Sequence, residues 1–136
     1  MALTDAQSGA LILDGSIPVE VTLAGTVAKG DLIGYSTGWK RALATAGSVV
    51  QGKAVAGMDG KTGDKIVAYF GKTRIGGRLT AMTAGSAVFG EEGSGNGKYT
   101  ETIPTTQNDS TKQVGVSISA TEAVIDPNAE ADTVHA

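Results

Sequence analysis

The stretch Gly30-Asp31-Leu32-Ile33-Gly34-Tyr35 guides the interpretation of this chain, because a similar pattern returns at Gly85-Ser86-Ala87-Val88-Phe89-Gly90. In both places a turn, a second strand-like segment, a loop and a third strand-like segment follow. These segments lie at 30–35, 39–43 and 50–56 in the first copy and at 85–90, 98–103 and 113–119 in the second. The pattern predicts one domain built from a duplicated β unit. In the third segments we align Gly52 with Gly115, where a strand bends or another backbone approaches closely.

The composition predicts a thin hydrophobic core. The chain has 136 residues, of which 20 are glycine and only 4% are aromatic, so the core must consist mainly of Val, Ile, Leu and Ala. This length supports one ordinary domain but is short for two. Because the chain has no cysteine, disulfides cannot stabilise it. Extra stability would therefore come from assembly.

The predicted fold class is all-β: a small β-barrel or tulip-like sandwich built from two related β units, with an extended N-terminal arm. Strands are indicated by the alternation of Val19, Val21 and Leu23 and by the apolar run Ile66–Phe70. The alanine-rich stretch Ala42–Val50 could form one helical turn. The predicted parts are an arm at 1–16, a β-domain at 17–125 with repeats at about 27–78 and 79–125, and a flexible acidic tail at 126–136.

The apolar run Leu11, Ile12 and Leu13 has two interpretations, and the sequence leaves both open. It is followed by the turn signal Asp14-Gly15, which separates it from the domain. As an extended arm, the run would bind a neighbouring subunit through these three side chains. As a first strand, it would belong to its own domain.

Charge is distributed unevenly along the chain. The segment from Lys29 to Arg78 holds nine basic and three acidic residues, a local balance of +6, whereas the whole chain has a net charge of −3. Solvated strand faces account for most such charges, but an uneven distribution can also steer an acidic partner. The candidate contact residues, each at a turn or strand end, are Lys40, Arg41, Arg74 and Arg78.

Motifs for catalysis or cofactor binding are incomplete in the sequence. Gly60-Lys61-Thr62 and Gly71-Lys72-Thr73 lack the earlier glycine of a phosphate-binding loop, since Val55 and Ile66 stand at that position. The single histidine, His135, lies next to the C-terminus, which is a poor place for a catalytic pair. We therefore expect a protein that is not an enzyme and has no cofactor, no metal site and no nucleic-acid partner.

No stretch of the sequence approaches the roughly 18 to 20 apolar residues of a membrane-spanning helix. The N-terminus carries Asp5 in place of the basic region of a signal peptide. We expect synthesis in the cytoplasm and no contact with a membrane.

Residues Asp31–Arg78 resemble the head-decoration, or capsid cement, proteins of tailed bacteriophages, both the lambda-like group and a broader group rich in Gly, Ala and Val. Val114-Gly115-Val116-Ser117 is similar to the final strands of the broader group. The matching elements of the first copy are Leu32-Ile33, Lys40–Ala44, Gly52–Gly57 and Lys65–Thr73.

This resemblance implies a structural protein on the outer surface of the phage head. It implies binding to the major capsid protein of the expanded icosahedral shell, as a homotrimer, and stabilisation of that shell against internal DNA pressure. One alternative is another structural role, in a tail tube, a baseplate or a surface β-module. A second is a carrier-type or enzyme accessory domain, because Val27–Leu32 is similar to the lysine-bearing turn of biotinyl and lipoyl carriers, although their modification triplets are missing.

Overall fold

The computed structural model describes residues 11–76, 82–92 and 97–136. In these residues the chain forms eleven strands and one short 3-10 helix, which confirms the predicted all-β fold. No helix in the described ranges is long and apolar enough to cross a membrane. The elements are β1 Leu11–Asp14, β2 Pro18–Thr22, β3 Leu32–Tyr35, β4 Trp39–Arg41, β5 Ala54–Ala56, β6 Lys65–Tyr69, β7 Thr73–Gly76, β8 Ala87–Gly90, β9 Tyr99–Thr100, β10 Gln113–Ser117, β11 Ala123–Ile125 and the helix η1 Pro127–Ala129.

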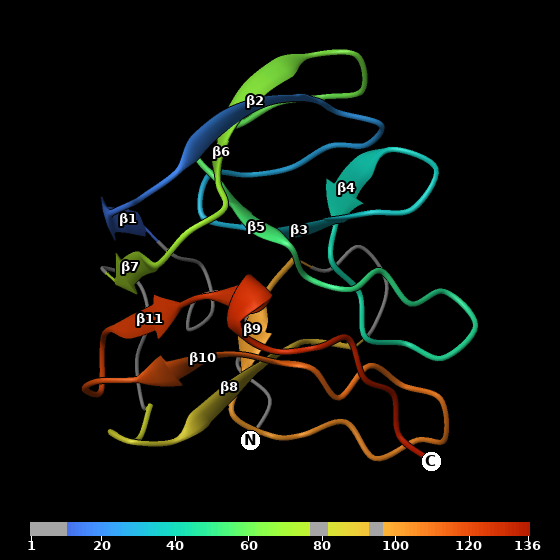
Figure 1. The fold of residues 1–136 in the computed structure, drawn as a ribbon, viewed down its shortest axis with the longest axis vertical. Coiled ribbons are helices and arrows are strands. Elements are labelled where there is room, and N and C mark those ends of the chain that lie inside the picture. The colour runs from blue at the N-terminus through green and yellow to red at the C-terminus, as the bar shows by residue number, and fades with distance from the viewer. Residues whose placement is uncertain (1–10, 77–81, 93–96) are drawn as a thin grey trace.

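The strands form two antiparallel sheets that repeat one topology (Figure 1). The first sheet has the order β4-β3-β5-β6-β2, and the second has the order β9-β8-β10-β11-β7 with β1 added beyond β7. Each strand of the first sheet thus has a counterpart five strands later in the chain. This correspondence confirms that the fold contains two related β units.

The boundary between the two units differs from the one suggested by the sequence. Strand β2 pairs with β6 and belongs to the first unit, whereas β7 pairs with β11 and belongs to the second. The units are therefore residues 18–69 and 73–125, while the predicted repeats, about 27–78 and 79–125, leave out β2 and place β7 in the first unit. The physical reason is that the chain crosses from one sheet to the other at Phe70 and Gly71, whose amides donate hydrogen bonds to Ile17 and Ser16.

The strand register also corrects the glycine equivalence between the two copies. Ile33 of β3 pairs with Ala54, and Val88 of β8 pairs with Gly115. Gly115 therefore corresponds to Ala54 and not to Gly52. A shift in register between Gln113 and Gly115 marks the bend that was predicted at this glycine.

Four tight turns share one geometry. In each, the amide of the fourth residue donates a hydrogen bond of 3.0–3.1 Å to the carbonyl of the first. The third residue is a glycine with φ between 83° and 91°, as a type II turn requires. One of them, together with the Leu43–Val50 bridge, replaces the helical turn that seemed possible at 42–50. The turns are Ala28–Asp31, Thr45–Ser48, Lys61–Asp64 and Thr83–Ser86.

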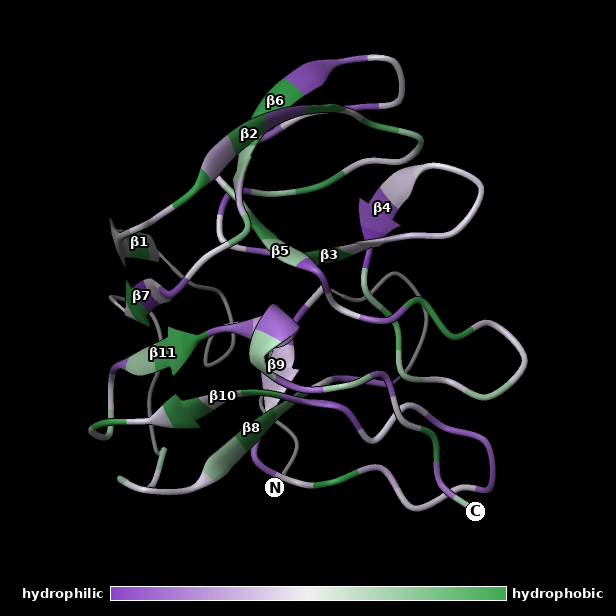
Figure 2. Ribbon diagram, viewed as in Figure 1, coloured by the Kyte–Doolittle hydropathy of each residue, from purple (hydrophilic) through white to green (hydrophobic). Residues whose placement is uncertain are grey.

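Two hydrophobic clusters hold the fold together, and β3 contributes to both of them. Ile33 faces a cluster inside the first sheet, whereas Leu32 faces a second cluster that is shared with the other unit. Neighbouring strand residues point to opposite faces, so β3 is buried on both sides. Figure 2 shows hydrophobic residues on the strands near the junction of the two units. The shared cluster consists of Leu32, Ala42, Val55, Ile75, Met82, Val88, Tyr99, Val114, Ala123 and Ile125.

The first sheet curls toward closure. Leu23, just after β2, forms a parallel bridge with Trp39 of β4, and the Ala24 amide donates a 2.7 Å hydrogen bond to the Trp39 carbonyl. The two edges of the sheet therefore meet, which makes this unit barrel-like. The Trp39 ring packs edge-on against Phe70, with a 5.4 Å distance between ring centroids.

The described part of the predicted arm is a strand of the domain itself. Strand β1 lies at the edge of the second sheet, antiparallel to β7, with Ile12 opposite Ile75. The Ile12 side chain packs against the shared cluster. Of the two interpretations left open by the sequence, the structure therefore has residues 11–14 as a strand of their own domain; residues 1–10 lie outside the described residues.

We predict that Gly115→Ala destabilises the protein by about 1 to 3 kcal/mol, because a Cβ at this position would lie 2.2 Å from the Val124 carbonyl oxygen. The matched control is Gly25→Ala, whose Cβ would lie no closer than 3.5 Å to another side chain and should cost less than about 0.5 kcal/mol. Urea unfolding measures both values. Equal effects of the two substitutions would contradict the close approach of β10 and β11.

Candidate functional site

The sequence-predicted contact residues lie on three separate strands. Leu11, Ile12 and Leu13 are in β1, Lys40 and Arg41 are in β4, and Arg74 is in β7. Arg78 lies outside the described residues. Strand β4 is an edge strand of the first sheet, and Figure 1 shows β7 on the opposite side of the molecule, so the basic residues do not form one continuous patch.

Arg41 is part of an internal ion-pair group. Its Nε lies 2.6 Å from an Asp31 carboxylate oxygen, and Lys98 Nζ lies 3.6 Å from the other oxygen. The same carboxylate accepts a 2.9 Å hydrogen bond from the Ala28 amide. Because Asp31 is buried, this group stabilises the turn before β3 and links it to Lys98 of the second unit.

The other two described basic residues also have partners within the chain. Arg74 pairs with Glu122 of the second unit at 2.8 Å, on an exposed surface. Lys40 Nζ donates a 3.3 Å hydrogen bond to the Thr37 hydroxyl, which is a neutral group. Of these cations, Lys40 therefore has the charge that is most available to an acidic partner.

Two open depressions adjoin Arg41 and share Thr26. One has a volume of about 500 Å³ and is lined by Lys40 and by the hydroxyl groups of Ser36 and Ser48. The other has a volume of about 410 Å³ and includes the 59–64 hairpin loop. Their polar linings can donate and accept hydrogen bonds, as a wet protein contact requires.

Tyr99 connects the two units from inside the core. Its ring is fully buried in the shared cluster, and its hydroxyl donates a 2.7 Å hydrogen bond to the Gly30 carbonyl. Burial raises the pKa of the Tyr99 phenol well above its usual value of about 10, and the charge of Asp31 acts in the same direction. The phenol therefore stays protonated and acts as a hydrogen-bond donor across the junction.

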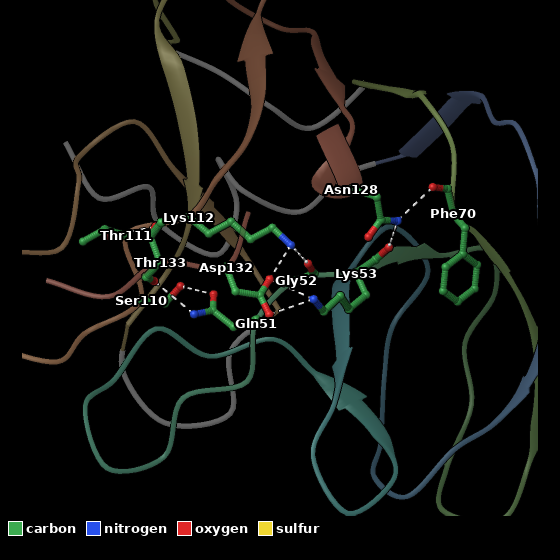
Figure 3. Close-up of polar contacts among 10 residues, drawn as sticks. All are labelled: Gln51, Gly52, Lys53, Phe70, Ser110, Thr111, Lys112, Asn128, Asp132 and Thr133. Carbon is green, nitrogen blue, oxygen red and sulfur yellow. Dashed lines mark hydrogen bonds and ion pairs between the residues drawn. The ribbon is translucent and has the colours of Figure 1, made fainter. Parts of the chain in front are cut away.

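The C-terminal residues form the most extensive polar contact between the units, which we call the C-terminal clasp (residues 128–135; Figure 3). Lys53 Nζ lies 2.8 Å from each carboxylate oxygen of Asp132, and Lys112 Nζ lies 2.8 Å from one of them. The side-chain amide of Asn128 donates hydrogen bonds to the backbone carbonyls of Lys53 and Phe70. The clasp therefore contacts both units at once.

Lys112 is the buried cation of this contact. Its side chain is 2% exposed, and its ammonium also donates a 2.8 Å hydrogen bond to the Gly52 carbonyl. Desolvation on its own would raise the pKa of the Asp132 carboxyl. The hydrogen bonds and charges of Lys112 and Lys53 outweigh this effect and hold the pKa of Asp132 below its usual range.

Residues 126–136, predicted as a flexible acidic tail, pack back onto the domain in the structure. Their low apolar content suggested a free tail, but charge pairing and backbone hydrogen bonds hold them instead. Sequence reasoning also missed Lys112 and Tyr99. Tyr99 lies in β9 and Lys112 directly precedes β10, so both were recognisable as polar or amphipathic side chains at strands of the second repeat. The sequence did not identify a partner for either side chain.

Within the described ranges, no group of three or more His, Asp or Glu side chains is placed to hold a metal ion. No family model, curated protein or solved structure matches the chain.

We predict that Asp132→Asn lowers the free energy of unfolding by about 1 to 2 kcal/mol at pH 7. The loss should exceed that of an exposed ion pair because Lys112 is buried, but solvent screens the half-exposed Asp132. Because the folded-state pKa of Asp132 is lowered, its contribution is present above the ordinary value of about 4 and is lost as the pH falls through the folded-state pKa. The difference between variant and wild type should therefore shrink below pH 4.

The control for this prediction is Glu130→Gln, which removes an acidic residue of the same segment that makes no ion pair with any described residue. Urea unfolding at several pH values provides the measurement. A Glu130→Gln effect as large as that of Asp132→Asn would mean that net charge, and not the clasp, is responsible.

Proposed function

We propose that this chain is a non-enzymatic decoration protein that binds the outer surface of the expanded head of a tailed phage and stabilises the shell. Its partner would be the major capsid protein, and it would reside in the virion. The proposal extends the resemblance of residues 31–78 to capsid cement proteins. The proposed function requires no cofactor and no catalytic group.

The observation that carries the proposal is the way in which the two units are joined. Leu32 and Val55 of the first unit pack in one cluster with side chains of the second. Tyr99 and Lys112 add hydrogen bonds across the same junction, and Asp132 adds an ion pair with Lys53 of the first unit. Close-packed protein interiors have low compressibility, so a load on one sheet is transmitted to the other. This property suits a protein that braces neighbouring capsid subunits.

The edge of β1 offers a route of attachment to the shell. Among the described strands, β1 has a partner on one side only, β7. An extended segment of another chain can add to such an edge through main-chain hydrogen bonds. The predicted contact through Leu11, Ile12 and Leu13 would then take place at a sheet edge and not through a detached arm.

Stabilisation of the shell would follow from mass action. A ligand that binds only the expanded lattice shifts the equilibrium toward that lattice. If the protein is a trimer, each molecule touches several capsid subunits, and the later contacts form at a high effective concentration. Contacts that are individually weak are then sufficient to hold the protein on the shell and stabilise it.

We predict that the protein sediments with expanded shells of the phage or prophage that encodes it and does not sediment with unexpanded shells. Lys40→Glu should weaken binding at low ionic strength and have less effect near 0.5 M salt, where the Debye length is about 4 Å. The control is Lys65→Glu, which changes an exposed lysine on β6 that does not line either of the depressions that adjoin Arg41. Equal sedimentation with both shell types, or with neither, would contradict the proposed function.

We also predict a homotrimer in solution, because the aliphatic core is thin and oligomerisation would add buried surface. Light scattering across a concentration series should give about three times the 13.6 kDa chain mass at high concentration. Growth into rings or filaments would instead favour the tail-tube alternative. A modified lysine in a mass spectrum would favour the carrier alternative.

A further inference from the structure

The C-terminal clasp binds as an extended peptide to a surface formed by Lys53, Lys112 and residues 108–111, which we call the groove. The Thr111 amide donates a hydrogen bond to the Thr133 carbonyl, and the His135 amide donates one to the Asp109 carbonyl. Ser110 and Val134 form an antiparallel bridge between these two contacts. This is the pattern of β-strand addition, in which the backbone of a bound segment supplies much of the affinity.

The groove also selects a carboxylate. The ammonium groups of Lys53 and Lys112 contact the carboxylate oxygens of Asp132. The side-chain amide of Gln51 donates a 3.0 Å hydrogen bond to the backbone carbonyl of the next residue, Thr133. Lys112 is buried when a segment is docked, and a docked segment without the carboxylate would leave its ammonium with the Gly52 carbonyl as its described acceptor. A buried charge of this kind requires an anionic partner. The groove is therefore complementary to an extended acidic segment.

The clasp is attached by polar contacts and contributes little apolar burial. Pro127 is buried and keeps the start of the segment on the domain, but residues 128–134 are all exposed. Val134, the one large aliphatic side chain of the clasp, is 51% exposed. Residues 126–136 carry three acidic and no lysine or arginine residues, which matches the two lysines of the groove. Release of this segment does not disrupt a hydrophobic cluster.

A second copy of the chain presents an identical segment, and its binding would restore every contact that the first segment makes. Exchange between copies is therefore close to neutral in contact energy. In one chain the segment is favoured by its tether, which for a short flexible linker corresponds to an effective concentration of about 1 mM. The seven residues after Ala129 span at most about 25 Å when extended, so exchange requires copies that lie close together.

We propose that the groove formed by Lys53, Lys112 and residues 108–111 is a recognition site for an extended acidic segment, and that residues 130–136 of a second copy of this chain can occupy it. The clasp of one copy would then link it to the next. This inference does not rest on the proposed role in a phage head, because it concerns only contacts that the chain makes with its own C-terminal segment.

Disulfide trapping tests the exchange, and the chain has no native cysteine that would interfere. The hydroxyl oxygens of Thr111 and Thr133 lie 3.1 Å apart, so cysteines at these two positions can bond when the segment is docked. A chain with both Thr111→Cys and Thr133→Cys reports docking within one copy. An equimolar mixture of the two single variants can form this bond only between copies.

The mixture is oxidised in a glutathione buffer from about 0.05 to 2 mM protein, which brackets the effective concentration of the tether. We expect an interchain dimer whose yield rises with protein concentration and exceeds, by several-fold, the yield from Thr121→Cys mixed with Thr133→Cys. Thr121 is an exposed residue outside the groove and measures random collision. Asp132→Asn in the Thr133→Cys chain should lower the yield toward that background.

Two results would overturn the proposal. If the double variant forms its bond within one chain but the mixture never exceeds the Thr121 background, the segment stays on its own copy. If the mixture exceeds that background and Asp132→Asn leaves the yield unchanged, the groove does not recognise the carboxylate.

Discussion

Strands β3 and β5 bury side chains on both faces, and the arrangement of the other elements depends on this constraint. Ile33 and Ala54 complete the interior of the first sheet, while Leu32 and Val55 on the opposite face must pack against something else. The second sheet provides that surface. One small set of aliphatic residues therefore belongs to two clusters at once, which allows a chain with few aromatic residues to build a continuous core. Truncation of Leu32 would leave a cavity at the point where the two units meet.

Polar groups at the junction supplement this thin core and determine how the units are aligned. Hydrophobic contact is not directional, so Leu32 and Val55 alone would tolerate small rotations of one sheet against the other. The Tyr99 hydroxyl, the Asp31 carboxylate and the Lys112 ammonium each have specific partners in the other unit. Satisfying buried polar groups requires one geometry, since an unpaired group in this environment is costly. The junction therefore specifies an orientation as well as a contact.

The segments near the two ends of the chain each pack against a unit that is distant from them in sequence. Each unit needs a strand beside β6 or its counterpart β11, and β2 and β7 take these positions. The second unit gains β1 at its outer edge, so the N-terminal segment stabilises the unit that is farther from it in sequence. The C-terminal clasp then returns to the first unit through Lys53. Strand β1 and the C-terminal clasp thus connect the two units, which makes the domain a single body in spite of its internal repeat.

The sequence by itself determined the features that arise from local preference. Alternating apolar residues predicted the strands, and the two copies of the Gly30–Tyr35 pattern predicted the duplication. Glycines at the third position of the type II turns carry a direct signal, because only glycine adopts this backbone conformation at little cost.

Tertiary structure alone decided the features that depend on residues distant in the chain. The assignment of β7 to the second unit and the pairing of β1 follow from which sheet edge was available. The clasp joins Lys53 to Asp132, which are 79 residues apart, through charges that have no periodic pattern in sequence. Residues 126–136 have too few apolar side chains to fold alone, so composition suggested a free tail. They are ordered by the buried Lys112 and by hydrogen bonds to the backbone of residues 108–111 of the second unit, and such partners become apparent only when the chain is folded.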